Sequence, residues 1–179
     1  MKLFNPLLCA LLAAMSLAAS AHTVLEYPVA TAGQSYKATF KVGHGCGTSS
    51  TRQIVVDIPA GVQGAKPMPK TGWRLEVSRD KLAKPYTSHG RTVTEDVTRI
   101  SWTAKTADDM LPNGHYDEFV LVGTLPEQAG TMYWPVQQVC EQGRMDWTDT
   151  PQPGQKLSDL KSPAAVLELM PGAGGAHAH

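Results

Sequence analysis

The sequence predicts an all-β fold, an antiparallel β-sandwich in a single domain. Apolar and polar residues alternate with a period of two in several short segments, which is typical of strands with one buried face. Turns that contain glycine and proline separate these segments. No segment carries the long 3.6-residue apolar repeat of an amphipathic helix. About seven short strands with this spacing predict a sandwich of immunoglobulin-like shape.

The first three predicted strands lie before residue 78. Residues 36–42 alternate between apolar or aromatic side chains and lysine or threonine, so one face of this strand is buried. Residues 52–58 are rich in β-branched side chains and end at Pro59. Residues 73–77 alternate again. Residues 80–86 lose the alternation, and we expect a short helical turn or a loop there.

The second half of the chain continues the same pattern. Strands are predicted at residues 98–103, 119–125, 131–139 and 165–169. Residues 150–164 contain prolines and a glycine, and we expect an irregular connection there.

The first residues of the chain have the features of a secretory signal peptide. A lysine follows Met1, residues 7–14 are an apolar run, and Ala19-Ser20-Ala21 fits the small-x-small cleavage pattern. We expect cleavage before His22, with a cut after Ala19 as the alternative. The expected organisation is therefore a signal peptide at 1–21, one domain at 22–170 and a flexible tail at 171–179. The expected location is periplasmic or secreted.

Composition and motifs exclude several classes of function. The formal net charge is zero and no basic stripe is present, so nothing favours a nucleic acid or an anionic lipid surface as partner. No apolar run of about 18 residues follows the signal, so no membrane span is expected after its removal. Ser49 and Ser50 lack the GxSxG context of a nucleophile, and no phosphate-binding glycine loop is present.

Three cysteines are present, and Cys9 lies in the expected signal peptide. Cys46 and Cys140 remain, and two cysteines in an exported protein most simply form one disulfide. Closing so long a loop contributes about 4 kcal/mol in the chain-entropy account. The alternative is a pair of thiolate ligands for copper. Neither cysteine belongs to a CxxC motif, which favours the disulfide.

A mature N-terminus at His22 would create a metal-binding group that an internal histidine lacks. The free α-amine and the imidazole of one residue can chelate one ion, once the amine has lost its proton. His22 and Glu26 share a face of an extended strand but stand about 13 Å apart along it. Each candidate taken singly also fits an ordinary structural role. The candidate ligands are His22, Glu26, His44, His115, Asp117, Glu118, His177 and His179.

Separated blocks of the sequence resemble one family, the YcnI-type copper-binding domain of exported bacterial proteins. The blocks occur in one order, cover nearly all of residues 22–170, and are specific as a set. They are AHTVLE at 21–26, GHGCG at 43–47, KPMPKTGW at 66–73, LPNGHYDEF at 111–119, and YWPVQQVCE at 133–141 with DWT at 146–148.

The resemblance implies an immunoglobulin-like sandwich that holds one Cu(II) per chain. It implies that His22 chelates through its amine and ring, and that Trp147 lies at the copper rather than in the core. It also implies an acidic ligand, for which Glu118 and Glu26 are the candidates. An indole offers no strong lone pair, so Trp147 would act by cation–π contact and by covering an axial position. The cysteine pair looks like a feature of this branch of the family.

These expectations favour copper carriage, delivery or homeostasis over catalysis. The expected partners are the copper ion and another copper-handling protein of the membrane or periplasm. His177 and His179 are expected to be a secondary, dispensable site. One alternative is a copper-dependent oxidative enzyme of monooxygenase type, which needs a second histidine, His44 or His115. The other is a metal-free sandwich that binds a protein.

Overall fold

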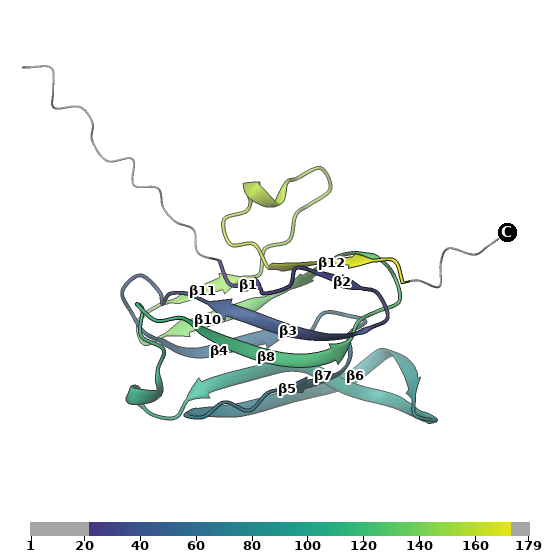
Figure 1. Cartoon of the computed structure of the whole chain (residues 1–179), viewed down its shortest axis with the longest axis horizontal. Coiled ribbons are helices and arrows are strands. Elements are labelled where there is room, and N and C mark those ends of the chain that lie inside the picture. Colours follow the sequence, from purple (N-terminus) through teal and green to yellow (C-terminus); the bar gives the residue numbers. More distant parts are fainter. Residues whose placement is uncertain (1–21, 173–179) are drawn as a thin grey trace, which may run out of the picture.

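The computed structural model describes residues 22–172, which form strands joined by turns and two single 3₁₀ turns (Figure 1). The strands are β1 (Val24–Leu25), β2 (Val29–Thr31), β3 (Ser35–Val42), β4 (Thr51–Asp57), β5 (Gln63–Pro67), β6 (Trp73–Ser88), β7 (Arg91–Ala104), β8 (Asp117–Thr124), β9 (Gly130–Trp134), β10 (Val136–Cys140), β11 (Arg144–Trp147) and β12 (Ala165–Met170). The 3₁₀ turns are η1 (Ala107–Asp109) and η2 (Leu157–Asp159).

Two antiparallel sheets form the sandwich, and a small third sheet lies beside them. The first has the order β1-β3-β8-β5, and the second has the order β11-β10-β4-β7-β6. The third, β2-β12-β9, contains a parallel pair, β2 with β12. The predicted all-β, immunoglobulin-like architecture is confirmed, apart from this one parallel pair. In the first two sheets the outermost strands include β1 and β11, which lie side by side at one edge in Figure 1.

The core lies between the facing sheets and is built from the alternation that the sequence displays. Tyr36, Ala38, Phe40 and Val42 of β3 all point inward and are buried. Aromatic side chains provide most of the buried volume and meet edge to face, an arrangement that adds about 0.5–1.5 kcal/mol per pair. These contacts join Phe40 to Trp134, Trp73 to Phe119, and Trp102 to Phe119. Trp73, Trp102 and Trp134 are therefore core residues, as the strand patterns predict.

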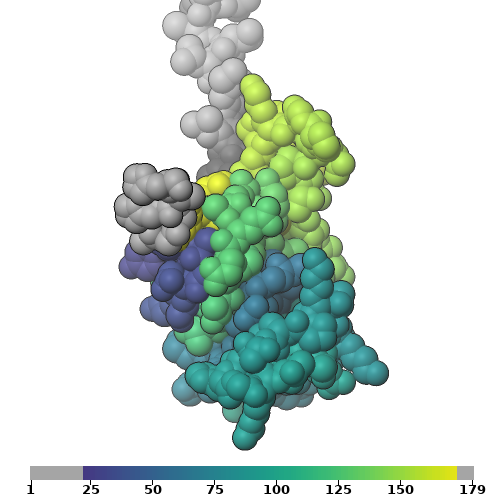
Figure 2. All heavy atoms as spheres, turned by 90° about the vertical axis from the view of Figure 1, so that its right-hand side faces the viewer, coloured from purple at the N-terminus to yellow at the C-terminus, as the bar shows by residue number. Residues whose placement is uncertain are grey.

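The segment at residues 80–86 corrects the sequence prediction, because it is part of the long strand β6 and not a helical turn or loop. The pairing of β6 with β7 shifts register between Lys81 and Tyr86, which breaks the period of two. The hairpin turns at His89 and Gly90, both with positive φ, as a two-residue type I′ turn requires. Its tip (teal) and the irregular 150–164 connection (yellow-green) lie at opposite ends of the face in Figure 2.

Cys46 and Cys140 form the predicted disulfide across 94 positions of sequence, with their Cα atoms 5.9 Å apart. The bond ties the loop after β3 to the last residue of β10. The alternative, a pair of thiolate ligands, is therefore wrong for the oxidised protein.

Within residues 22–172, no helix is long and apolar enough to cross a membrane. The predicted signal peptide at 1–21 lies outside the described residues, and so do tail residues 173–179 with His177 and His179. The expected irregular connection at 150–164 is confirmed, with η2 inside it.

A buried carboxylate fixes the β6–β7 hairpin to the turn in β5. Asp96 is 4% exposed and accepts hydrogen bonds from the Tyr86 hydroxyl (2.6 Å) and from the backbone N–H groups of Gly64 and Val97 (both 2.7 Å). Burial raises the pKa of Asp96, but these three hydrogen bonds and the nearby charge of Arg79 outweigh it. The net effect holds this pKa below its ordinary value of 3.8.

We predict that Asp96 stabilises the fold in a pH-dependent way. Since its folded-state pKa is lowered, its contribution is complete above about pH 4 and is lost as the pH falls through the folded-state value. At neutral pH, Asp96→Asn should lower the free energy of unfolding by about 1–3 kcal/mol, because an amide cannot satisfy all these donors. Denaturant unfolding at pH 7 and pH 3 measures this. The exposed Asp108→Asn is the control, and equal losses in the two variants would contradict the prediction.

Candidate metal centre

The structure brings together two residues of the predicted site, His22 and Trp147, which are far apart in the sequence. Their ring centroids are 5.1 Å apart and the ring planes meet at 77°, an edge-to-face contact. His22 lies just before β1, and Trp147 is the last residue of β11. The contact therefore closes the edge of the sandwich where the outer strands of the two sheets meet (Figure 1).

Trp147 belongs to the core as well as to this edge. Its side chain is 4% exposed and packs in the main hydrophobic cluster. Trp147 pairs with Val136 of β10, a fully buried residue, so its position faces into the sandwich. The prediction that Trp147 lies outside the core is wrong in this respect, because the same indole fills the core and meets His22.

Gln138 holds the indole of Trp147 from inside the sandwich. The indole Nε1–H donates to Gln138 Oε1 at 3.4 Å, and Gln138 Nε2 donates to the His44 carbonyl (2.6 Å) and to Thr51 Oγ1 (2.7 Å). Sequence reasoning missed Gln138. The available signal was a polar residue on the same strand parity as Val136 and Cys140, both inward-facing.

The two candidate carboxylates lie on the outer face of the first sheet, on either side of Lys41. Glu26 Oε2 forms an ion pair with Lys41 Nζ at 2.9 Å, and Lys41 pairs in register with Glu118 of β8. Both carboxylates are partly exposed, so solvent screens their charges and the ion pair contributes at most about 1 kcal/mol. Lys41 thus offsets part of the negative charge that two glutamates place on this face.

Tyr116 marks the point on this face where the negative charges converge. Its hydroxyl donates to Glu118 Oε1 at 2.5 Å. This hydrogen bond raises the pKa of Tyr116 to about 12, helped by partial burial and by the charges of Glu118, Glu26 and Asp117. The negative charges of Glu26 and Glu118 therefore both act at the Tyr116 hydroxyl, although the two residues come from different parts of the sheet.

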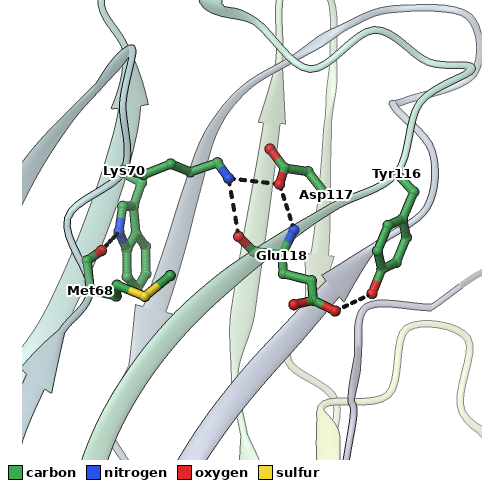
Figure 3. A network of polar contacts seen from close by, with 6 residues as sticks. Met68, Lys70, Tyr116, Asp117 and Glu118 are labelled. Atoms are coloured by element: carbon green, nitrogen blue, oxygen red, sulfur yellow. Dashed lines mark hydrogen bonds and ion pairs between the residues drawn. The ribbon is translucent and has the colours of Figure 1, made fainter.

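Asp117 and Glu118 point to different partners, as expected for neighbours in a strand (Figure 3). Asp117 Oδ1 accepts from Lys70 Nζ at 2.6 Å and from the backbone N–H of Glu118 at 2.8 Å. The same ammonium lies 5.2 Å from the centre of the Phe119 ring. The contact of Asp117 with Lys70 therefore joins the LPNGHYDEF block to the KPMPKTGW block. This role is structural, and it does not make Asp117 a metal ligand.

His22 and Glu26 do not converge in the described chain. The backbone N–H of Glu26 still donates to Thr39 O at 2.9 Å, so β1 continues its pairing as far as Glu26 and the chain does not bend back between the two. Among residues 22–172, no group of three or more His, Cys, Asp or Glu side chains has a metal-binding arrangement. In the 179-residue chain the His22 nitrogen is an amide joined to Ala21, so the amine donor of the predicted site does not yet exist.

The other candidate histidines occupy loops. His44 Nδ1 lies 2.5 Å from the carbonyl oxygen of Gly45, and the His44 carbonyl is the group that Gln138 binds. His115 is exposed in a turn, where its backbone N–H donates to Pro112 O at 3.0 Å. His44 is thus connected to Trp147 through Gln138, whereas His115 has no hydrogen bond, ion pair or ring contact to that part of the described chain.

Comparison with known proteins identifies the family. The sequence model of a family described as a domain of unknown function, DUF1775, matches residues 22–169. The chain belongs to the DUF1775 family. YcnI-type domains are members of this family, so the resemblance in the sequence blocks is confirmed at the level of the domain. No curated protein sequence matches the chain.

A solved structure has the same architecture as this DUF1775 chain. It is described as an uncharacterized protein from Nocardia farcinica with an immunoglobulin-like fold. The two share 23% sequence identity with a TM-score of 0.62, over 83% of this chain and 97% of the other. At this identity the likeness establishes the immunoglobulin-like fold and nothing about function.

Proposed function

We propose that the mature protein is an exported copper carrier that binds one Cu(II) at His22, beside Trp147. The observation that carries the proposal is the contact between these two rings at the edge of the sandwich. The two residues are 125 positions apart, His22 just before β1 of the first sheet and Trp147 at the end of β11 of the second, so the fold and not the local sequence places them together. The proposed location is the periplasm or the exterior, in agreement with the disulfide.

The donor set fits Cu(II) as cargo. After cleavage before His22, an amine and an imidazole become available on one residue, and Cu(II) prefers nitrogen donors and leads the divalent affinity series. An acidic side chain would add an oxygen donor. Trp147 adds no strong lone pair, but an indole is attracted to a neighbouring cation by a cation–π interaction and excludes water from it.

Carriage fits this site better than catalysis. Oxygen activation at copper needs an open coordination position. The nearly buried indole of Trp147 packs against His22 and would occupy space on one side of an ion bound there. The monooxygenase alternative also needs a second histidine ligand, and only Nε2 of His44 could serve while Nδ1 stays at the Gly45 carbonyl. We propose a copper-handling protein of the membrane or periplasm as the partner that supplies or receives the ion.

Glu118 is the better of the two carboxylate candidates. Glu26 is held in an ion pair with Lys41, and this ammonium would compete with a metal for the carboxylate. Glu118 accepts one hydrogen bond from a neutral hydroxyl, that of Tyr116, and a carboxylate has further lone pairs to offer.

We predict that Cu(II) binding depends on a free amine at His22. A matched pair of proteins, one starting at His22 and one with a single alanine before it, should differ in Cu(II) affinity by more than about 10-fold, or about 1.4 kcal/mol. An acylated nitrogen is no longer an amine donor, whereas the imidazole is the same in both. Isothermal titration with N-termini verified by mass spectrometry measures the difference. Equal affinities would overturn the proposed site.

We predict that Glu118→Gln weakens Cu(II) binding more than Glu26→Gln does. The expected loss for Glu118→Gln is about 10-fold, since an amide oxygen is a weaker donor than a carboxylate. Glu26→Gln should leave the affinity within about 3-fold, because it only releases Lys41. Titrations of the two isosteric variants provide the comparison. The opposite ranking would assign the ligand role to Glu26.

We predict that Trp147 quenching reports copper at the site. The chain has four tryptophans, so the Cu(II)-dependent loss of fluorescence must be compared between the native protein and Trp147→Phe. Most of the quenching should disappear in the variant, because Trp147 is the tryptophan in contact with His22. Copper-driven peroxide chemistry should rise as the site opens. Strong turnover in the native protein that Trp147→Phe abolishes would favour the enzyme.

A further inference from the structure

The side chain of Gln138 is an exception in the core of the sandwich. It is 1% exposed and sits on the inward face of β10 between Val136 and Cys140. Burying an amide is unfavourable unless its hydrogen bonds are made, and here three are made. An apolar residue of similar size would fill the same space, so the amide has a role other than filling volume.

The neighbours of Gln138 allow one orientation of its amide. The two N–H groups of Nε2 face two acceptors, the His44 carbonyl and Thr51 Oγ1. The oxygen faces the N–H of Trp147, which can only donate. A flipped amide would set its NH₂ against the indole donor and its oxygen against the His44 carbonyl. Gln138 thus presents its oxygen to Trp147 because Thr51 and His44 occupy its nitrogen.

The groups that fix Gln138 are themselves anchored. Thr51 Oγ1 lies 3.9 Å from Cys140 Sγ, in the disulfide that holds the loop of His44. In the same loop, the backbone N–H of Gly45 donates to Asn113 Oδ1 at 2.9 Å, and a Cβ on Gly45 would lie 1.8 Å from Ser49 O. No larger residue fits at Gly45 without moving this loop. The acceptor at His44 is therefore part of a close-packed, cross-linked segment.

Burial of a tryptophan does not by itself require such an anchor in this fold. Trp134 is 1% exposed, and its Nε1–H has no hydrogen-bond partner within the part of the chain that the structure describes. The core thus contains Trp134 without an acceptor, Trp102 bonded to the backbone carbonyl of Met68 at 3.0 Å, and Trp147 bonded to a side-chain amide. Of these three indoles, Trp147 is the one whose ring contacts His22.

We propose that Gln138 is a positioning residue for the metal site: it fixes the orientation of the Trp147 indole and thereby the edge that meets His22. The effect of Gln138 on metal binding rests on the proposed copper function. The orientation of the indole by Gln138 does not depend on that function. Gln138 acts through Trp147, whose indole N–H it accepts. Without the side-chain oxygen of Gln138, the Trp147 indole loses the hydrogen bond that sets its rotation. The contact between the indole and His22 then varies.

The first test replaces Gln138 by methionine, which is close in shape and makes no amide hydrogen bond. The matched control is Gln137→Met, one position earlier on β10 and on the opposite face. In the copper-free protein, Gln138→Met should shift the indole N–H resonance of Trp147 in a ¹⁵N–¹H spectrum and speed its exchange with solvent. The control should leave it unchanged. An unshifted Trp147 resonance in Gln138→Met would overturn the proposal.

A second variant acts on Gln138 without touching Trp147. Thr51→Val keeps the size of the side chain but removes one acceptor of Gln138 Nε2. It should move the same Trp147 resonance in the same direction, by a smaller amount. A variant that merely loosens the core would broaden signals throughout the spectrum instead, and that outcome would count against positioning. Thr51→Val also decides the question if Gln138→Met does not fold.

The copper arm tests the functional consequence. In protein starting at His22, Gln138→Met should weaken Cu(II) binding by about 10-fold, or about 1.4 kcal/mol, and leave Gln137→Met near the native value. A shifted indole with unchanged Cu(II) affinity would show that the orientation of Trp147 does not matter to the metal, and would overturn the proposal. If the native protein itself binds no Cu(II), the copper function fails, while the copper-free spectra still decide whether Gln138 orients Trp147.

Discussion

The inward row of β10 is the constraint on which the rest of the structure depends. Every second residue of β10 faces inward, and each of these residues makes a different contact. They are Val136, Gln138 and Cys140. Val136 fills the core, Gln138 binds the loop of His44 and the indole of Trp147, and Cys140 closes the disulfide. A one-residue slip of this strand would turn all three outward, so register is strongly specified here. The edge of the sandwich keeps its shape because this row joins its parts.

The two sides of the candidate centre have different physical origins. Trp147 reaches the edge from the interior, held by packing and an amide, whereas Glu26 and Glu118 lie on the solvated face of the first sheet, where Lys41 and Tyr116 moderate their charge. Buried groups in a close-packed core move little. Partly exposed carboxylates on long side chains change partners at low cost. A metal bound at His22 would therefore meet a fixed indole, and an acid recruited to it would be one that can exchange its present partner.

The sequence predicts the parts of this protein that follow a simple period. Phe40 and its neighbours on β3 face inward as their alternation requires, and the cysteine pair forms the expected bond. The prediction of a helical turn or a loop at residues 80–86 is wrong because a register shift interrupts the alternation inside β6. Trp147 was singled out by family resemblance, and no periodicity could show that one indole would serve both core and edge. Gln138 went unnoticed because its importance lies in three contacts with distant residues.

Processing would complete a site that the fold has largely built. Trp147, Gln138 and the disulfide are in place in the folded 179-residue chain, whereas an amine at His22 would exist only after cleavage before this residue. Ordering costs are met once, during folding, so the ion would meet a preorganised indole. The proposed ligand His22 would be the first residue of the mature chain, and it lies just outside β1. A terminal residue opens at lower free energy than a core strand. Such a site would hold the ion between a preorganised indole and a chain terminus that opens more easily than the core, which suits a carrier that must surrender its ion.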